Sequence, residues 1–457
     1  MTKLQMTNSK TTIAIRGGRV IEPQSDIDKL TDIQITDGVI SHFGATDVKC
    51  DDVIEAKGLI ICPGLCDMHV HLREPGRENE ETVESGSRAA AAGGFTAVAC
   101  MPNTQPALDN QGMVELIKSL ETPYCRVHPV GAISKGLEGL ELAEIGDMVR
   151  AGAVAISDDG RPLADSNLMR RALDYCRMFG IPVISHCEDK FLSADGAMNE
   201  GALATRLGLR GIPNAAEASM AYRDCQLAAL TGSRVHIAHV SCAETVEVVR
   251  QAKKQGIAVT AETCPHYFTL TEEAVIGYNE MARVNPPLRT KKDAEAIIEG
   301  LKDGTIDCIA SDHAPHSYEE KEVEFDQAPT GMIGLETALG LCWTHLVENK
   351  VLTPLQLVEK MSVNPRKILG IFKQEEEAKK FQEAILEARG KSNIQGIPNQ
   401  GLIAVGQPAD LTLFDPNAEW TVDPEQFQSL SRNTPFGGWR LKGRAVLTFH
   451  SGNMIKI

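Results

Sequence analysis

The middle of the chain alternates short apolar segments with longer amphipathic ones. Between residues 64 and 312, apolar and β-branched runs of strand length are followed by stretches with helical apolar spacing, such as 80–92, 244–255 and 291–302. This alternation is typical of βα units and a parallel sheet. Eight repeats favour a closed (β/α)8 barrel over an open doubly wound sheet. The predicted strands are 65–70, 94–101, 126–133, 153–157, 181–185, 234–239, 257–263 and 306–311.

The two ends of the chain show a different pattern. Residues 12–61 and 401–457 alternate apolar and polar positions, with Gly and Asp at the turns, which indicates short antiparallel strands. We therefore predict an α/β fold in which a (β/α)8 TIM barrel is inserted into a small β-sandwich-like domain built from both ends. The predicted divisions are 1–62 with 401–457 for the β-domain, 63–372 for the barrel, and 373–400 for a helical, charged connecting insertion.

Composition narrows the classes of partner. The chain has 46 basic and 62 acidic side chains, a net charge of −16, which argues against a nucleic-acid surface. No apolar run has the length of a membrane span, and the N-terminus lacks the apolar core of a secretory signal. The 12 cysteines form no CxxC pair, so we expect reduced, mostly buried thiols in a cytoplasmic protein. An anionic substrate would need a local cationic pocket.

Histidine and aspartate residues gather at the ends of the predicted strands. Because strand side chains alternate between faces, His69 and His71 point the same way from the end of the first strand, as two ligands of one metal must. The carboxyl ends of barrel strands form the face that carries active sites. Imidazole and carboxylate groups there predict a site for Zn²⁺ or a similar ion. The further candidates are Asp158 or Asp159, which spacing cannot separate, His186, His239 and Asp312.

Three other histidines receive different interpretations. His236 shares a strand with His239 but lies deeper, so a packed core histidine is favoured over a further ligand. His266 lies just past the seventh strand, and the pattern leaves open whether it supports the site. His313 adjoins Asp312 and is expected to hydrogen-bond to it.

Several motifs together resemble a known family. HLREPG, MPNT and SDHAPH are specific in combination, whereas the HxH pair and GQPADL mark only the superfamily. The chain resembles the class I, bacterial-type dihydroorotases of the amidohydrolase superfamily from about residue 12 to its end, apart from 373–400. The motifs are DMHVHLREPG (67–76), MPNTQP (101–106), AISDDG (155–160), SHCED (185–189), HIAHVS (236–241), AETCPHYF (261–268), NPPLR (285–289) and IASDHAPH (309–316).

The resemblance implies an activity and a set of site residues. The activity is the reversible, zinc-dependent hydrolysis of (S)-dihydroorotate to N-carbamoyl-L-aspartate, a step of de novo pyrimidine biosynthesis. One or two zinc ions are implied, with two favoured and Asp159 between them, and Asp312 is the implied catalytic proton-transfer residue. The implied metal ligands are His69, His71, Asp159, His186, His239 and Asp312. The implied substrate contacts are His71, Leu72, Arg73, Asn103, Asn285, His316, Thr330 and Gly331.

Arg73 addresses the need for a local cation. Its guanidinium can grip a substrate carboxylate in a bidentate fork, two residues after His71 on the predicted reactive rim. The alternative is a surface arginine that neutralises Glu74.

Two other functions remain as alternatives. Hydantoinases, dihydropyrimidinases and allantoinases share the barrel and the HxH pair, but they resemble one another in bridging their metals through a carboxylated lysine, and residues 150–159 contain no lysine. A non-catalytic dihydroorotase-like subunit of a transcarbamoylase complex would lack several ligands, and none is missing here. We expect a homo-oligomer, with a dimer as one form, and leave open an association with aspartate transcarbamoylase.

Overall fold

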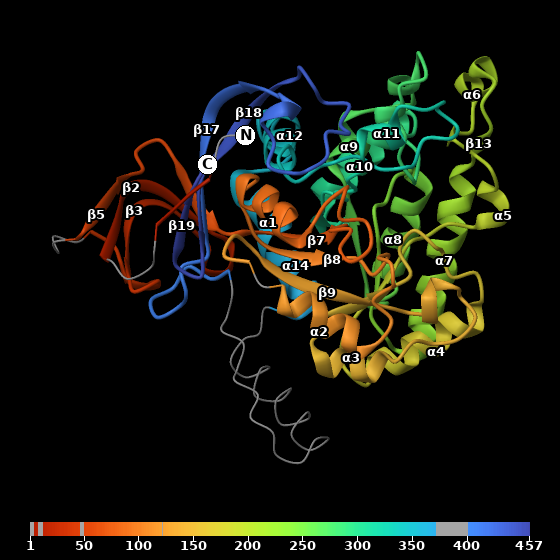
Figure 1. Ribbon diagram of the computed structural model, residues 1–457, viewed down its shortest axis with the longest axis horizontal. Coiled ribbons are helices and arrows are strands. Elements are labelled where there is room, and N and C mark those ends of the chain that lie inside the picture. The colour runs from red at the N-terminus through yellow and green to blue at the C-terminus, as the bar shows by residue number, and fades with distance from the viewer. Residues whose placement is uncertain (1–3, 8–11, 46–49, 121, 372–400) are drawn as a thin grey trace.

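Eight parallel strands form one sheet that curls into a barrel (Figure 1). The computed structural model describes residues 4–7, 12–45, 50–120, 122–371 and 401–457. Each strand lies within a few residues of a predicted one, so the barrel prediction is confirmed. In order around the sheet, the strands are β16 (Cys308–Ile309), β15 (Val259–Thr263), β14 (Val235–Ile237), β11 (Val183–Ser185), β10 (Ala155–Ser157), β9 (Arg126–Ala132), β8 (Phe95–Cys100) and β7 (Leu65–Val70).

The segment after β16 closes the barrel against β7. His313 forms a parallel bridge with Val70, and the His71 N–H donates to the His313 carbonyl at 2.8 Å. The end of the first strand and the residues after the last are therefore held side by side. Since His71 and Asp312 lie on these two segments, closure of the barrel places them together.

Helices alternate with the strands and cover the barrel (Figure 1). Thr82 and Ser85 cap the start of α1 reciprocally, and Thr290 and Asp293 do the same for α10, which gives both helices a defined start. The helices are α1 (Val83–Ala92), α2 (Gln111–Ser119), α3 (Ile145–Ala151), α4 (Ser166–Arg177), α5 (Lys190–Ser193), α6 (Ala202–Leu207), α7 (Asn214–Thr231), α8 (Ala243–Lys254), α9 (Pro265–Thr269), α10 (Lys291–Asp303), α11 (Tyr318–Lys321), α12 (Ala338–Cys342), α13 (Pro354–Val358) and α14 (Asn364–Leu369).

The inside of the barrel is a packed core. Met68, Val130, Ile184 and Cys308 belong to one buried cluster that also contains Leu369 of α14. Small alanine side chains from several strands fill the space between them. The barrel therefore encloses a core and not a pore, and polar chemistry is confined to its rim.

A nine-stranded mixed sheet joins the two ends of the chain. Its β6 pairs antiparallel with β17, about 350 positions later, so both ends build one sheet as predicted. The expectation of antiparallel strands fails at β2, which pairs in parallel with β5 and β6. The strands are β1 (Gln5–Thr7), β2 (Thr12–Glu22), β3 (Ile27–Thr36), β4 (Val39–Phe43), β5 (Asp52–Glu55), β6 (Ile60–Pro63), β17 (Leu411–Thr421), β18 (Arg440–His450) and β19 (Asn453–Lys456).

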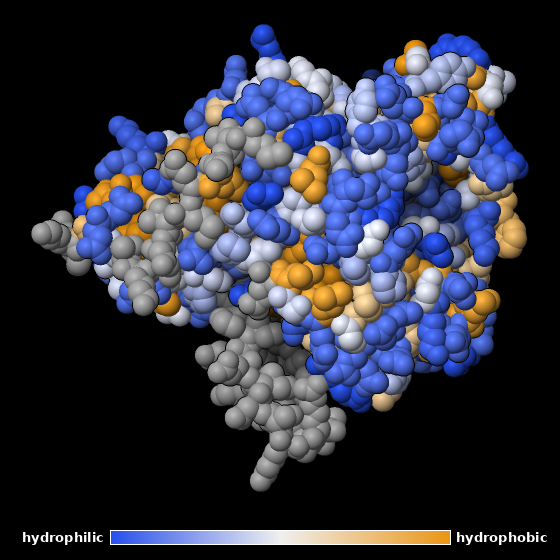
Figure 2. Space-filling model, in the orientation of Figure 1, coloured by the Kyte–Doolittle hydropathy of each residue, from blue (hydrophilic) through white to orange (hydrophobic). Residues whose placement is uncertain are grey.

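The proposed domain limits stay predictions, and the helical insertion at 373–400 lies outside the described residues. No helix in the described part of the chain is both long and apolar enough to cross a membrane. Figure 2 shows hydrophilic side chains over much of one face, with smaller apolar areas between them. Eleven of the twelve cysteines are buried, as expected for mostly buried thiols.

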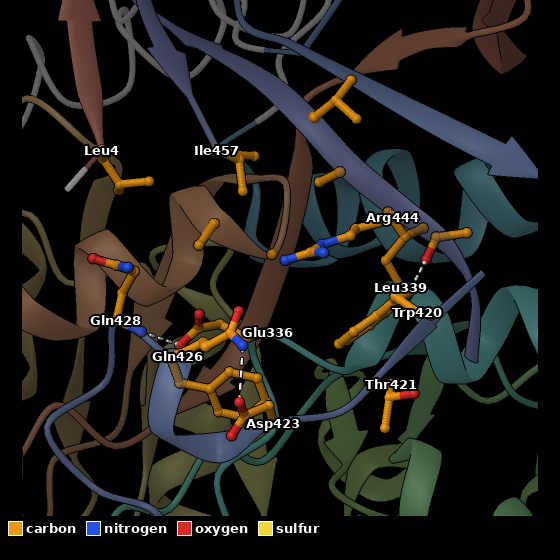
Figure 3. A pocket seen from close by; sticks show the side chains of 17 residues that line it. Leu4, Glu336, Leu339, Trp420, Thr421, Asp423, Gln426, Gln428, Arg444 and Ile457 are labelled. Carbon is orange, nitrogen blue, oxygen red and sulfur yellow. Dashed lines mark hydrogen bonds between the residues drawn. The ribbon is translucent and has the colours of Figure 1, made fainter. Parts of the chain in front are cut away.

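A cavity of about 300 Å³ lies where the C-terminal strands meet the barrel (Figure 3). Glu336, Trp420 and Arg444 contribute to its lining. Glu336 accepts backbone N–H groups of Gln428 and Ser429 at 2.8 and 3.1 Å, and burial raises its pKa to about 8. None of the residues predicted for the active site lines this cavity.

Candidate active site

Two groups of buried side chains share one carboxylate at the rim of the barrel. His69, His71 and Asp159 bring their donor atoms within 4.8 Å of one another, and Asp159, His186 and His239 do the same. Oδ1 of Asp159 lies 3.3 Å from His69 Nε2, 3.4 Å from His186 Nδ1 and 3.5 Å from His239 Nε2. The donor atoms of the two groups therefore converge on Asp159 from two sides.

Asp312 completes the set of six predicted ligands. Its Oδ1 lies 3.2 Å from His71 Nε2 and 3.6 Å from His69 Nε2. Asp312 and His239 adopt positive φ angles of 49° and 33°, which residues other than glycine rarely do. Such backbone conformations persist where the surrounding structure enforces them, and they cluster at functional sites.

Oxygen atoms outside the centre orient three of the imidazole rings. His69 Nδ1 donates to Glu262 at 2.7 Å, His71 Nδ1 donates to Asn103 Oδ1 at 2.8 Å, and His186 Nε2 donates to Glu188 at 3.0 Å. The other nitrogen of each ring faces the centre, and in a neutral ring that nitrogen would carry no hydrogen and could bind a metal. This is the arrangement by which neighbouring groups fix the tautomer of a metal-ligating histidine.

The residues fit a metal centre. His69 Nε2 and Asp159 Oδ1 are buried and have no hydrogen-bond partner among the described residues. His186 Nδ1 and His239 Nε2 face each other at 2.8 Å, as two nitrogens directed at a common point do. Burial opposes the charge of Asp159, but His69 and the two other imidazoles outweigh it and hold its pKa well below the ordinary value. Imidazole nitrogen and ionised carboxylate are donors that divalent zinc prefers.

The structure separates the two adjacent aspartates. Asp158 Oδ1 accepts the backbone N–H groups of Ile133 and Ser134 at 2.8 and 3.0 Å. Only Asp159 reaches the histidines. Asp158 therefore stabilises the loop after β9, and Asp159 is the residue of the pair that can bind metal.

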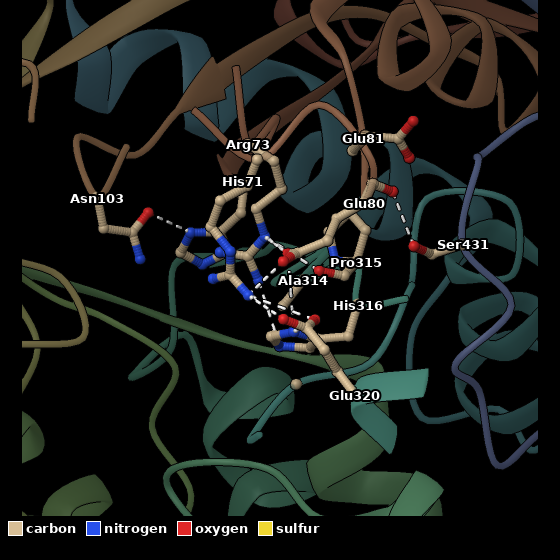
Figure 4. A network of polar contacts seen from close by, with 12 residues as sticks. His71, Arg73, Glu80, Glu81, Asn103, Ala314, Pro315, His316, Glu320 and Ser431 are labelled. Atoms are coloured by element: carbon tan, nitrogen blue, oxygen red, sulfur yellow. Dashed lines mark hydrogen bonds and ion pairs between the residues drawn. The ribbon is translucent and has the colours of Figure 1, made fainter. Parts of the chain in front are cut away.

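Arg73 lies beside the centre in a network of polar contacts (Figure 4). Its side chain is buried, its Nε donates to the Pro315 carbonyl at 3.0 Å, and it pairs with Glu80 Oε2 at 3.2 Å. Nη2 lies 3.4 Å from His316 Nε2. The alternative of a surface arginine paired with Glu74 is wrong, because Arg73 is 6% exposed and its carboxylate partner is Glu80.

The other predicted substrate contacts lie close to Arg73 or to the histidines. His316 Nε2 donates to the Thr330 carbonyl at 3.0 Å, and an added Cβ at Gly331 would lie 3.2 Å from His316 Nε2. Asn285 Nδ2 donates to Glu188 at 2.9 Å. The Leu72 side chain belongs to the main hydrophobic core, so a substrate at the rim would meet its backbone.

The remaining histidines are placed as follows. His236 is fully buried below the site, where it contacts Thr260 and Glu262, as a packed core residue does. His266 is buried, its ring can approach Asp312 to within 4.8 Å, and burial lowers its pKa to about 4. The expected bond from His313 to Asp312 is wrong: its Nε2 faces Glu81 at 3.3 Å and its Nδ1 accepts the Gly334 N–H. His313 bridges Val70 and Met332, and Glu81 and Gly334 hold its ring away from Asp312.

Comparisons with known proteins agree on one family. A family model described as Dihydro-orotase-like matches residues 58–245. The chain is 51% identical over 445 residues to a dihydroorotase of Pelotomaculum thermopropionicum, which covers 97% of this chain and 98% of the relative. It is 50% identical over 444 residues to a dihydroorotase of Acetivibrio thermocellus, with 96% and 98% covered. The chain belongs to the dihydroorotase family.

Structural comparison places this dihydroorotase family member within a wider group. Its fold is similar to that of an L-hydantoinase (dihydropyrimidinase) from Arthrobacter aurescens, with a TM-score of 0.82, 26% identity, and 97% and 95% of the two chains covered. The overall fold is therefore shared with an enzyme that carries another name. The much higher identity to the dihydroorotases favours that family over the hydantoinase alternative.

Two residues that contact the candidate site were not predicted from the sequence. Glu262 and Glu188 orient His69 and His186, and both stood within quoted motifs, AETC and SHCED. The available signal was their position along the chain, since Glu262 lies near the end of β15 and Glu188 lies three residues after the end of β11. No pattern in the sequence indicated which histidine each carboxylate would face.

Proposed function

We propose that the protein catalyses the reversible hydrolysis of the cyclic amide of (S)-dihydroorotate to N-carbamoyl-L-aspartate. The observation that carries this proposal is the pair of donor groups that meet at Asp159, with Arg73 and Asp312 beside them. Near-50% identity to dihydroorotases over almost the whole chain supports it. The presence of all six candidate ligands argues against a non-catalytic subunit.

The metal ligands would be His69, His71, Asp159, His186, His239 and Asp312, with Asp159 shared by two zinc ions. Bound zinc would lower the pKa of water toward about 7 and polarise the scissile carbonyl. Imidazole and carboxylate donors at the rim support this choice of ion. Two overlapping donor groups support a count of two.

Asp312 is the residue proposed to move the proton. Its carboxylate lies at the rim, and although burial opposes its charge, the nearby His69 and His71 keep its pKa below the usual range. It can accept the proton released during attack and deliver it to the leaving ring nitrogen, as a general base that becomes a general acid. In the direction of ring closure, the same carboxylate acts in reverse.

Arg73 is proposed to bind the substrate carboxylate. Its guanidinium is fixed from one side by Glu80 and by the Pro315 carbonyl, so its remaining N–H groups are pre-oriented. Asn103 and Asn285 offer amide groups near the histidines, and His316 with the Thr330–Gly331 backbone lies on the other side of Arg73. Together they would orient the ring for attack.

A substrate comparison tests the function. Purified protein should form dihydroorotate from N-carbamoyl-L-aspartate, as followed by chromatography, and should not open hydantoin. A chelator should abolish turnover and added zinc should restore it, with elemental analysis giving the metal content per chain. Hydantoin turnover with inert dihydroorotate would replace this proposal by the hydantoinase alternative. Robust turnover by metal-free protein would remove the metal-dependent mechanism.

The partner assignments stay predictions from the sequence. We expect a homo-oligomer in the cytoplasm, and size-exclusion chromatography with light scattering measures its mass. An association with aspartate transcarbamoylase would appear in the same experiment as a joint peak when both proteins are mixed.

A further inference from the structure

A short segment near the C-terminus, Ser429–Asn433, packs against the residues that are proposed to bind substrate. It follows β17 in sequence and belongs to the part of the chain that returns after the barrel. Ser429 Oγ donates to Glu81, and Ser431 Oγ donates to the Glu80 carbonyl at 2.7 Å, a contact drawn in Figure 4. Ser429, Ser431 and Asn433 are all buried.

The Asn433 side chain makes three hydrogen bonds to the segments that carry His316 and Gly331. Its Nδ2 donates to the carbonyls of Ala314 and Gly331 at 3.0 and 3.2 Å, and its Oδ1 accepts the His316 backbone N–H at 3.1 Å. Its own carbonyl accepts the Ile333 N–H at 2.9 Å. The side chain is 2% exposed, so water cannot replace these bonds. One amide therefore ties together the two chain segments that carry His316 and Gly331.

The two segments leave little room for adjustment. A Cβ at Gly331, which has a φ of 136°, would lie 2.7 Å from the Ala314 Cβ and 3.2 Å from His316 Nε2. Nη2 of Arg73 lies 3.4 Å from the same His316 nitrogen. A shift of either segment would therefore move the groups that face Arg73.

The same segment also reaches Arg73 from its other side. Glu80, whose carbonyl is held by Ser431, pairs with Arg73 Nε at 3.2 Å. The Ser429–Asn433 segment therefore supports the positions of Arg73, His316 and Gly331 together. None of the segment's own side chains contacts the six candidate metal ligands among the contacts of the described residues.

We propose that Asn433 is a positioning residue that sets the geometry of the substrate-carboxylate pocket. It holds the His316 and Gly331 segments at a fixed distance from Arg73 and does not itself touch substrate. The inference rests on the proposed function, since it assigns Asn433 to the binding of dihydroorotate. Misplacement of binding groups by about 1 Å can cost about 100-fold in rate or affinity.

Asn433→Asp tests the proposal with almost no change in size. The substitution keeps an acceptor for the His316 N–H but turns the donor toward Ala314 and Gly331 into a second oxygen, which repels both carbonyls. We expect KM for dihydroorotate to rise about 10- to 100-fold, with kcat reduced much less. Metal content should stay at the wild-type value. The matched control is Asn417→Asp, because Asn417 is exposed on β17 and undergoes the same change in charge.

A second ligand separates positioning from general damage. 5,6-Dihydrouracil has the same ring without the carboxylate, so its inhibition constant should change less than the KM for dihydroorotate. An unchanged KM in Asn433→Asp, or equal loss of both ligands, would overturn the inference. If that variant does not fold, Asn433→Ser removes the reach to the Ala314 and Gly331 carbonyls without adding a charge and should raise KM in the same direction; an unchanged KM there would also overturn the inference. Wild-type protein inert toward dihydroorotate would refute the proposed function instead.

Discussion

Glu262 offers a sharp test of how the candidate metal centre is built. It is fully buried, and its Oε1 accepts the His69 Nδ1 proton at 2.7 Å. Its Oε2 lies 3.3 Å from His236 Nε2. Glu262→Leu removes the acceptor and leaves the His69 N–H buried and unpaired. Glu262→Gln retains an acceptor for His69 but loses the charge.

The magnitude follows from the shorter contact. A 2.7 Å bond from imidazole to carboxylate is charge-assisted and stronger than the contact with His236. Removing such an outer partner of a ligating histidine typically costs about 10- to 100-fold in metal affinity, or about 1.4–2.8 kcal/mol. We expect Glu262→Leu to approach the upper value and Glu262→Gln the lower one, because the glutamine still fixes the tautomer.

Competition with a chelator measures the effect on purified apoprotein at constant pH. Thr260→Val is the matched control, since it removes the hydroxyl that contacts His236 at 2.8 Å and leaves the Glu262–His69 bond in place. Its zinc affinity should stay within about 2-fold of wild type, below the range for loss of an outer partner. Wild-type zinc affinity in Glu262→Leu would refute the reasoning, and urea unfolding of the apoprotein separates metal affinity from loss of stability.

Three further outcomes are expected. Asp312→Asn should retain most of its metal by elemental analysis yet lose about 100- to 10,000-fold in kcat, and an active variant would assign proton transfer elsewhere. Arg73→Lys should raise KM much as Arg73→Ala does, because a point charge cannot replace a bidentate fork; full rescue by lysine would contradict that geometry. The pKa of Glu336 is raised from 4.5 to about 8 by burial, so its contribution to stability is complete below pH 4.5 and is lost as the pH rises through 8. Glu336→Gln should therefore gain up to about 1.4 kcal/mol per pH unit over wild type in urea unfolding across that range, whereas the exposed control Glu295→Gln should show no such trend.

The barrel could be predicted because its pattern is local. Each strand is a short apolar run followed by an amphipathic helix, and every predicted strand has a counterpart within a few residues. The terminal sheet was predicted less completely. Alternation of apolar and polar residues indicates a strand but does not give the direction of the neighbouring strand. The parallel pairing of β2 with β5 and β6 therefore could not be predicted from the sequence.

The candidate site shows the same division between local and distant information. His69, Asp312 and the Asp158–Asp159 pair were found because a barrel places the ends of all its strands on one face, and the family resemblance then selected Asp159. The partner of His69 was not, since Glu262 lies 193 positions away and several carboxylates share that face. The wrong partner for His313 came from treating adjacent residues as spatial neighbours, although their side chains diverge.

The charge of the candidate site depends on the carboxylates around the histidines as well as on Arg73. The sequence suggested that Arg73 and two zinc ions together make a cationic pocket in an acidic protein, and in the structure Arg73 is already paired with Glu80. Asp159, Asp312, Glu262 and Glu188 place four carboxylates around the histidines, with side chains no more than 15% exposed. Buried charges are costly unless they are compensated, and imidazoles that bind metal do so in the neutral form. Two divalent ions would balance the four carboxylates, whereas one would leave two without a counter-charge, so the charge balance supports the proposed count of two.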